Sequence, residues 1–410
     1  MKFTVKIDPK TIPEVNIGML GHVDHGKTTL TQAITGKMTD THSEEIKRGI
    51  SIRLGYADVT FYKCKKCKTY CTTKKCPKCF EDTEILRTVS FVDAPGHESL
   101  MATVLTGSAL IDGALLVIAA NEKCPSPQTR EHLTALDVVG IKNIIIIQNK
   151  IDLADEERVK QSYEEIKQFV KGTVAENSPI IPVSAMQRVN IEYVVEAIEN
   201  NIPTPKRDLN KDPKMYVARS FDVNKPGSEV DKLVGGILGG SIVEGKLEKN
   251  QEIELRPGIR VNENWRPIKT KIVSMEKAGK KLDEAGAGGL LGILTELDPF
   301  LTKADGMVGN IVGLPEKLPE TRNRISIETH LLDRVVGTKE ELKMSGIKQN
   351  EILMINVGTG RSVGMATKTK GNTIELTLKL PICANVGERV VLSRQVMGRW
   401  RLIGYGILKK

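Results

Sequence analysis

The segment from Gly21 to Thr28 reads Gly-His-Val-Asp-His-Gly-Lys-Thr, which is the residue pattern of a phosphate-binding loop. Its outer glycines, Gly21 and Gly26, allow the backbone to turn so that consecutive N–H groups point at phosphate oxygens. We expect Lys27 to reach the β- and γ-phosphates, and the Thr28 hydroxyl to ligate magnesium. The other loop residues predicted to contact the ligand are Asp24, His25 and Thr29. The alternative is a chance glycine-rich turn, but an expected strand precedes the loop and an expected helix follows it.

A second group of polar residues, Asp93-Ala-Pro-Gly96-His97, directly follows another apolar run. Asp93 at the end of a strand can hold magnesium through a water molecule, and Gly96 can offer its N–H to the γ-phosphate. His97 stands where a residue that orients the attacking water is usually found. We therefore expect His97 to be catalytic, with a purely structural histidine as the alternative.

A third motif, Asn149-Lys150-Ile151-Asp152, follows the apolar run 143–148. The Asp152 carboxylate can accept hydrogen bonds from N1–H and the N2 amine of guanine, whereas adenine offers neither donor. Lys150 is expected to stack its aliphatic stem on the base, and the N–H groups of Ser184 and Ala185 to donate to guanine O6. Met186 completes the predicted contacts. Together the three motifs predict a site for GTP and GDP rather than for ATP.

The stretch 40–56 lies between the phosphate loop and Asp93, where a switch segment belongs. Such segments become ordered through the γ-phosphate and its magnesium ion. Ser51 is the best candidate in this stretch for a hydroxyl that completes the magnesium shell when GTP is bound.

Five of the seven cysteines fall within sixteen positions. Cys64 and Cys67 form one Cys-x-x-Cys knuckle, and Cys76 and Cys79 form a second one. Four thiolates with this spacing can close a tetrahedral zinc site, and a lysine-rich surrounding favours the thiolate form. Cys71 lies between the pairs and could replace a ligand; a redox or vestigial role of the cluster is the alternative to zinc. The two remaining cysteines, Cys124 and Cys383, are expected to be packing residues.

These motifs require elements that bring them together, and the first half of the chain alternates apolar runs with amphipathic stretches. The expected strands are Val15–Leu20, Thr88–Val92, Gly113–Ala119, Asn143–Gln148 and Ile180–Val183. The expected helices are Lys27–Ile34, Glu98–Ser108, Pro127–Val139, Asp155–Lys171 and Ile191–Asn200. This alternation predicts an α/β fold with a doubly wound, mostly parallel sheet, in which ligands bind at the carboxyl ends of the strands.

After a proline-spaced linker at 202–213 the chain consists of short strand-like pieces separated by glycine turns. The expected pieces are Met215–Asp222, Leu233–Val243, Gln251–Arg256 and Ile268–Met275, followed by an all-β stretch from Arg324. We predict a GTP-binding domain at 1–205 with a zinc-knuckle insertion at about 62–82, and two β-barrel domains at 206–320 and 321–410.

The chain has 60 lysine and arginine residues against 51 acidic ones, a net charge of +9. Seven lysines and no acid occur in 63–78, and the last twenty residues are also basic. This distribution fits a polyanionic partner, with solubility as the alternative interpretation. No apolar run approaches the roughly 20 residues of a membrane span, and the first residues lack a signal-peptide core. We expect a cytoplasmic protein.

The motifs and their order resemble the translational GTPases related to elongation factor Tu, and among them the gamma subunits of archaeal translation initiation factor 2. The resemblance covers essentially the whole chain. It is carried by Gly21–Thr28, Glu44–Tyr56, the cysteine knuckles, Asp93–His97, Leu332–Gly337 and Arg399–Tyr405.

The resemblance implies two magnesium ions in the GTP state. Thr28 and Ser51 would serve one ion, and Asp24 and the Gly49 carbonyl would serve the other. Val23 and Ile50 match a hydrophobic pair that flanks the path of the hydrolytic water beside the catalytic histidine. Many relatives have threonine at the position of Ser51. The serine retains the hydroxyl group but lacks the methyl group.

The resemblance also implies a GTPase that forms GDP and phosphate, and that carries methionylated initiator tRNA to the small ribosomal subunit and its mRNA start complex. It would be the core of a heterotrimer with alpha and beta subunits. A selenocysteine-type or other elongation-type carrier of aminoacyl-tRNA is the nearest alternative. Two further alternatives are a GTPase that delivers a metal, and a scaffold protein in which GTP hydrolysis is vestigial. Trp400 in the basic tail is either an RNA-stacking residue or a core residue.

Overall fold

A computed structural model describes residues 7–39, 54–94, 105, 109–225, 227, 229–334 and 344–409. The chain forms two compact units: the first comprises 1–97, 111–129 and 141–206, and the second comprises 98–110, 130–140 and 207–410. The helix expected at 98–108 lies outside the described residues except for Leu105. The domain limits that we derived from the sequence stay predictions.

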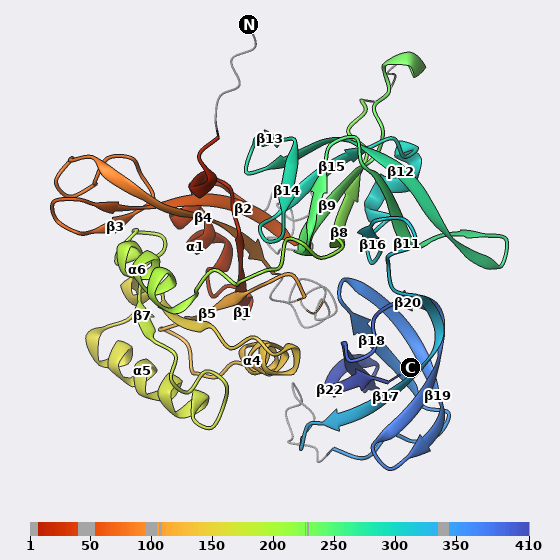
Figure 1. Ribbon diagram of the computed structural model, residues 1–410. Helices are drawn as coiled ribbons and strands as arrows, with labels where there is room; N and C mark the ends of the chain where they lie inside the picture. Colours follow the sequence, from red (N-terminus) through yellow and green to blue (C-terminus); the bar gives the residue numbers. More distant parts are fainter. Residues whose placement is uncertain are drawn as a thin grey trace, which may run out of the picture. The chain divides into compact units, whose positions relative to one another are not determined.

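The first unit is built on one sheet of seven strands (Figure 1). In spatial order these are β3 (Tyr70–Cys71), β2 (Gly55–Cys64), β4 (Thr83–Asp93), β1 (Val15–Gly21), β5 (Gly113–Ala119), β6 (Ile144–Asn149) and β7 (Ile180–Pro182). From β4 to β7 every neighbouring pair is parallel, whereas β2 runs antiparallel to both β4 and β3. The predicted doubly wound, mostly parallel sheet is thereby confirmed.

The helices of the first unit are α1 (Lys27–Thr35), α5 (Glu156–Val170) and α6 (Ile191–Asn201), with short 3₁₀ turns η1 (Pro9–Thr11) and η3 (Ile151–Leu153), while α4 (Pro127–Val139) begins in the first unit and continues in the second. Local signals set their ends. Asp155 caps α5 by accepting a hydrogen bond from the Arg158 N–H at 2.8 Å, and α1 ends at Gly36 in the left-handed conformation. All residues of β1, β5 and β6 are buried, as expected for strands covered on both faces.

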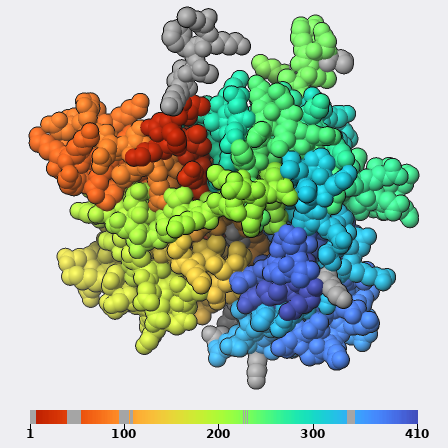
Figure 2. Space-filling model, viewed as in Figure 1, coloured from red at the N-terminus to blue at the C-terminus, as the bar shows by residue number. Residues whose placement is uncertain are grey.

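Strand β2 is one of the elements that the sequence analysis missed. We had assigned the residues up to 56 to a switch segment and those from about 62 to a knuckle, but β2 occupies Gly55–Cys64. Its antiparallel pairing with β4 also lengthens β4, which begins at Thr83 instead of Thr88. The two strands form a long hairpin whose outer end carries the cysteines. In the space-filling view this segment, in orange, lies at the edge of the first unit (Figure 2).

The second unit contains two β structures, as predicted. The first has a sheet of β8 (Lys214–Phe221), β9 (Ile237–Glu244), β11 (Glu252–Val261), β12 (Asn264–Lys277), β13 (Lys280–Leu282), β15 (Leu291–Thr295) and β16 (Ile311–Gly313). Pairing between β11 and β12 closes this sheet on itself. Beside it lie the ribbon of β10 (Lys246–Glu248) and β14 (Glu284–Gly286), the helix α7 (Pro299–Thr302), and the 3₁₀ turns η4 (Val230–Lys232) and η5 (Lys303–Asp305).

The second β structure is a closed barrel. Its strands are β17 (Thr321–Leu331), β18 (Ile352–Val357), β19 (Gly360–Lys370), β20 (Thr373–Cys383), β21 (Arg389–Val396) and β22 (Arg399–Leu408). Inward-facing aliphatic side chains such as Ile327, Ile355 and Leu392 fill it. Trp400 is half-buried and does not belong to that core cluster. Among the helices of the described residues, none has the length and apolar character to cross a membrane.

Candidate functional site

The phosphate loop connects β1 to α1, as the motif predicts. Gly21 has φ 140°, and a Cβ atom there would lie 2.2 Å from the Val117 carbonyl oxygen of β5. Gly26 has φ 87°, and its Cβ would lie 2.4 Å from Asn149 Nδ2. Any side chain at either position would strain the backbone and collide with a neighbour. The two glycines therefore let the loop lie directly against the ends of β5 and β6.

Thr28 and Asp93, two of the residues predicted to hold the first magnesium ion, lie together. Asp93 ends β4 beside β1, in register with Met19, and is almost fully buried. The Thr28 hydroxyl at the start of α1 donates to Asp93 Oδ2 over 2.8 Å. A hydroxyl and a carboxylate are hard oxygen donors of the kind that magnesium prefers, so this pair fits the ion. Asp24, predicted for a second ion, is exposed and has φ 60°.

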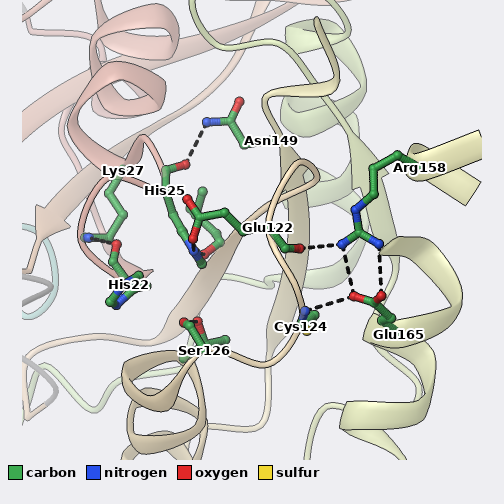
Figure 3. A network of polar contacts seen from close by, with 11 residues as sticks. His22, His25, Lys27, Glu122, Cys124, Ser126, Asn149, Arg158 and Glu165 are labelled. Atoms are coloured by element: carbon green, nitrogen blue, oxygen red, sulfur yellow. Dashed lines mark hydrogen bonds and ion pairs between the residues drawn. The ribbon is translucent and has the colours of Figure 1, made fainter. Parts of the chain in front are cut away.

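The Asn149 side chain joins two loops of the nucleotide site. Its Nδ2 donates to the His25 carbonyl over 2.9 Å, and its Oδ1 accepts from the Ala185 N–H over 3.0 Å. Figure 3 shows the first of these bonds reaching the phosphate loop. Asn149 is buried, so both bonds are shielded from water. Asn149 thus fixes the distance between the phosphate loop and the segment after β7.

The predicted guanine contacts lie at the ends of β6 and β7. Asp152 lies in η3 and is exposed, as is Met186. Lys150, two residues before Asp152, has φ 61°. The N–H groups of Ser184 and Ala185 donate within the protein, to Val189 and Asn149. Hydrogen bonds from these two groups to guanine O6 stay a prediction, since each would have to be shared.

The side chains of Lys27 and His25, two residues of the phosphate-loop motif, contact backbone carbonyls of the protein (Figure 3). Lys27 Nζ donates to the His22 carbonyl over 2.7 Å. His25 Nδ1 lies 3.1 Å from the Val117 carbonyl, and burial lowers the pKa of His25 to about 4. The ring is therefore neutral at pH 7, with Nδ1 facing the Val117 carbonyl and Nε2 lying 3.3 Å from a Glu122 carboxylate oxygen. The His25 side chain thus lies against β5, and the predicted contact of this residue with the nucleotide stays a prediction.

An ion pair that the sequence analysis missed supports the loop after β5 (Figure 3). Arg158 of α5 makes two hydrogen bonds to the Glu165 carboxylate, at 2.9 and 3.1 Å, and also donates to the Glu122 carbonyl. Glu165 in turn accepts from the Cys124 N–H at 2.9 Å. The bonds from Arg158 lower the pKa of the Glu165 carboxyl. Because Glu122 and Cys124 lie more than 30 residues before α5, no sequence motif indicated that they contact Arg158 and Glu165.

The four predicted zinc ligands converge at the end of the β2–β4 hairpin. The sulfur atoms of Cys64, Cys67, Cys76 and Cys79 all lie within 4.8 Å of one another. A tetrahedral site with zinc–sulfur bonds of about 2.3 Å requires sulfur separations of about 3.8 Å, so the cluster fits zinc. Cys71 is not part of this cluster: its thiol donates to the Thr73 carbonyl, and burial raises its pKa. Cys124 and Cys383 are buried, which confirms them as packing residues.

Several predicted residues lie outside the described part of the chain. They are Gly49, Ile50, Ser51, Gly96 and His97.

We expect Asn149→Ala to loosen the segment after β7 even without nucleotide. The Ala185 N–H loses its acceptor, so its hydrogen exchange should accelerate by roughly ten-fold or more. Hydrogen–deuterium exchange of the nucleotide-free protein measures this directly. Asn143→Ala is the matched control, because Asn143 precedes β6 at its opposite end and bonds to the Asp112 carbonyl. Equal exchange of Ala185 in both variants would contradict the linking role.

Family models match three successive parts of the chain. The elongation factor Tu GTP-binding domain matches residues 13–204, elongation factor Tu domain 2 matches 235–312, and the C-terminal domain of initiation factor eIF2 gamma matches 323–408. Two solved structures are similar in fold. A bacterial selenocysteine-specific elongation factor, EF-Sec, superposes with a TM-score of 0.75 at 25% identity, over 97% of this chain and 58% of that longer chain. Elongation factor SelB from Methanococcus maripaludis, in complex with the GTP analogue GppNHp, has a TM-score of 0.73 at 23% identity. The match covers 98% of this chain and 80% of the SelB chain.

Curated relatives are more similar still and match end to end. Translation initiation factor 2 subunit gamma from Methanocaldococcus jannaschii is 58% identical over 97% of both chains. The protein of the same name from Pyrococcus horikoshii is 59% identical over 97% of this chain and 98% of its own length. With the GTP-binding motifs in place at the strand ends, the chain belongs to the family of translation initiation factor 2 gamma subunits, which are GTPases related to elongation factor Tu.

Proposed function

We propose that this chain carries methionylated initiator tRNA to the small ribosomal subunit and its mRNA start complex in a GTP-dependent manner. It would act in the cytoplasm as the core gamma subunit of a heterotrimer with alpha and beta subunits. The observation that supports this most is the identity of 58–59% to initiation factor gamma subunits over nearly the whole chain, including the C-terminal domain at 323–408. A selenocysteine-type carrier is supported less, because those neighbours share 25% and 23% identity.

The carrier function depends on whether the γ-phosphate is present. Lys27 would release the His22 carbonyl and bind the β- and γ-phosphates, and the loop N–H groups would cradle the same oxygens. Magnesium, when bound, would neutralise charge on the phosphate oxygens; Thr28 and Asp93 would hold it, the latter through water. Asp152 and Lys150 would select guanine. Ser51 would join Thr28 at this magnesium ion, Asp24 and the Gly49 carbonyl would hold a second ion, and Val23 and Ile50 would flank the water path, as the family resemblance implies.

Hydrolysis requires a group that orients water toward the γ-phosphate, and we propose His97 for this role. His97→Ala should leave GDP and GTP affinity within about two-fold, since the residue follows the phosphate-binding motifs and is not needed for ground-state binding. Single-turnover hydrolysis should slow by roughly a hundred-fold or more. Unchanged single-turnover hydrolysis would reject the catalytic role.

Filter binding of radiolabelled tRNA tests the carrier function. We expect tight retention of methionylated initiator tRNA with a non-hydrolysable GTP analogue and at least roughly ten-fold weaker retention with GDP, because only the γ-phosphate orders the switch. Elongator methionyl-tRNA and selenocysteine tRNA serve as matched ligands that separate the two carrier classes. The assay is repeated with the alpha subunit added, since the isolated chain need not hold the complete site. Equal tRNA retention with the GTP analogue and with GDP, both with and without the alpha subunit, would refute the proposal.

We also propose that Cys64, Cys67, Cys76 and Cys79 hold a structural zinc ion. Metal analysis should find about one zinc per chain in the unmodified protein. The Cys76→Ser variant should lose most of its zinc, because only three of the four thiolate ligands of the tetrahedral site would remain. Cys71→Ser is the control: this cysteine is also buried in the knuckle but bonds to the Thr73 carbonyl, so its variant should keep the metal. Equal zinc content in the two variants, or none in the parent protein, would count against the site.

A further inference from the structure

Thr39 is bonded to the carboxylate of Asp93, although it belongs to none of the GTP-binding motifs. It lies four residues beyond the last residue of α1, and its side chain is almost fully buried. Its hydroxyl donates to Asp93 Oδ2 over 2.7 Å, and the Thr28 hydroxyl donates to the same oxygen over 2.8 Å. One carboxylate oxygen is therefore held by two hydroxyl donors that come from different parts of the chain.

Gly55 makes room for this contact. It is the first residue of β2 and lies directly opposite Asp93 in the β2–β4 pairing. A Cβ atom on Gly55 would lie 2.6 Å from Thr39 Cβ and 3.4 Å from Asp93 Cβ. The first distance is shorter than real carbon contacts, so a side chain at Gly55 would push Thr39 away from the carboxylate. No positive φ requires glycine here, so the space for Thr39 is what this position provides.

Holding Asp93 in one orientation has a chemical consequence. A carboxylate that binds magnesium through water must keep its oxygens at fixed positions, and a rotating carboxylate loses entropy when the ion binds. Hydroxyl donors to an ionised oxygen are among the stronger hydrogen bonds in proteins. Thr28 is expected to share its oxygen with the ion, whereas Thr39 bonds to the carboxylate alone. Thr39 is thus suited to hold Asp93 when the metal arrives.

We infer that Thr39 is a positioning residue for magnesium binding: it orients Asp93 without contacting the metal or the nucleotide. The inference rests on the proposed role of Asp93 in holding magnesium, and it does not depend on the identity of the tRNA. The competing explanation is that Thr39 only anchors the chain after α1. The two differ in one respect, because an anchoring role affects the protein equally with and without magnesium.

The release of a fluorescent GDP analogue, measured from excess EDTA to saturating magnesium, separates these roles. Thr39→Val keeps the shape but removes the hydroxyl, and it should raise the magnesium concentration for half-maximal slowing of release by roughly ten-fold. Thr39→Ser keeps the hydroxyl and should remain within about three-fold of the parent protein. In EDTA all three proteins should release the analogue at the same rate. Binding of Mn²⁺ to the GDP complex, followed by electron paramagnetic resonance, should show the same order of metal affinity.

Two further variants complete the test. Gly55→Ala should reproduce the Thr39→Val effect by displacing the threonine, whereas Thr88→Val is the matched control, because this buried threonine of β4 bonds to Thr60 and the Lys10 carbonyl. If Thr39→Val speeds release by the same factor with and without magnesium, or leaves its magnesium dependence unchanged, the inference is overturned. The Asp93→Asn variant shows whether only the role of Thr39 or also that of Asp93 is wrong. If this variant also keeps the magnesium dependence of the parent protein, the proposed role of Asp93 is rejected as well.

Discussion

The amide group of Asn149 is the contact on which the geometry of the nucleotide site depends most. The loops that bind phosphate and base come from distant parts of the chain, and each alone has few ways to keep a fixed position. By donating to His25 and accepting from Ala185, one buried side chain fixes both. Gly26 is a consequence of this arrangement, since only a residue without a side chain leaves room for the amide. Asn149 therefore couples the phosphate loop to the segment that is predicted to contact guanine.

The parallel sheet provides the frame for that contact. Strands β1, β4, β5 and β6 are neighbours whose carboxyl ends point the same way, so Gly21, Asp93 and Asn149 reach one edge. Strands β1, β5 and β6 are buried on both faces and cannot shift without exposing aliphatic surface. Hydrophobic burial thereby sets the positions of the polar groups, while hydrogen bonds such as that between Thr28 and Asp93 set their orientations.

Sequence reasoning could predict the parts of this site that obey a spacing rule. The strand-end motifs and the paired cysteines follow from local patterns, so the start of α1 after the phosphate loop and the convergence of the four cysteines could be predicted. Contacts between remote positions had no such signal. Thr39 meets Asp93 only because the register of β2 and β4 brings Gly55 beside both, and β2 itself was concealed between two segments assigned to other roles. The bonds from Arg158 to the Glu122 carbonyl and from the Cys124 N–H to Glu165 likewise required the position of α5 relative to the loop after β5.

The hairpin of β2 and β4 also makes the cysteine knuckle separable from the rest of the fold. The last paired residues of the hairpin are Cys64 and Thr83, and everything between them, including β3, projects beyond the parallel part of the sheet. An insertion at this point changes neither the register of β4 against β1 nor the position of Asp93. During evolution, a lineage could gain, lengthen or lose this module, or replace it with a tight turn, while its GTPase sheet kept the same register. The cysteine knuckle and the predicted nucleotide site can therefore vary independently.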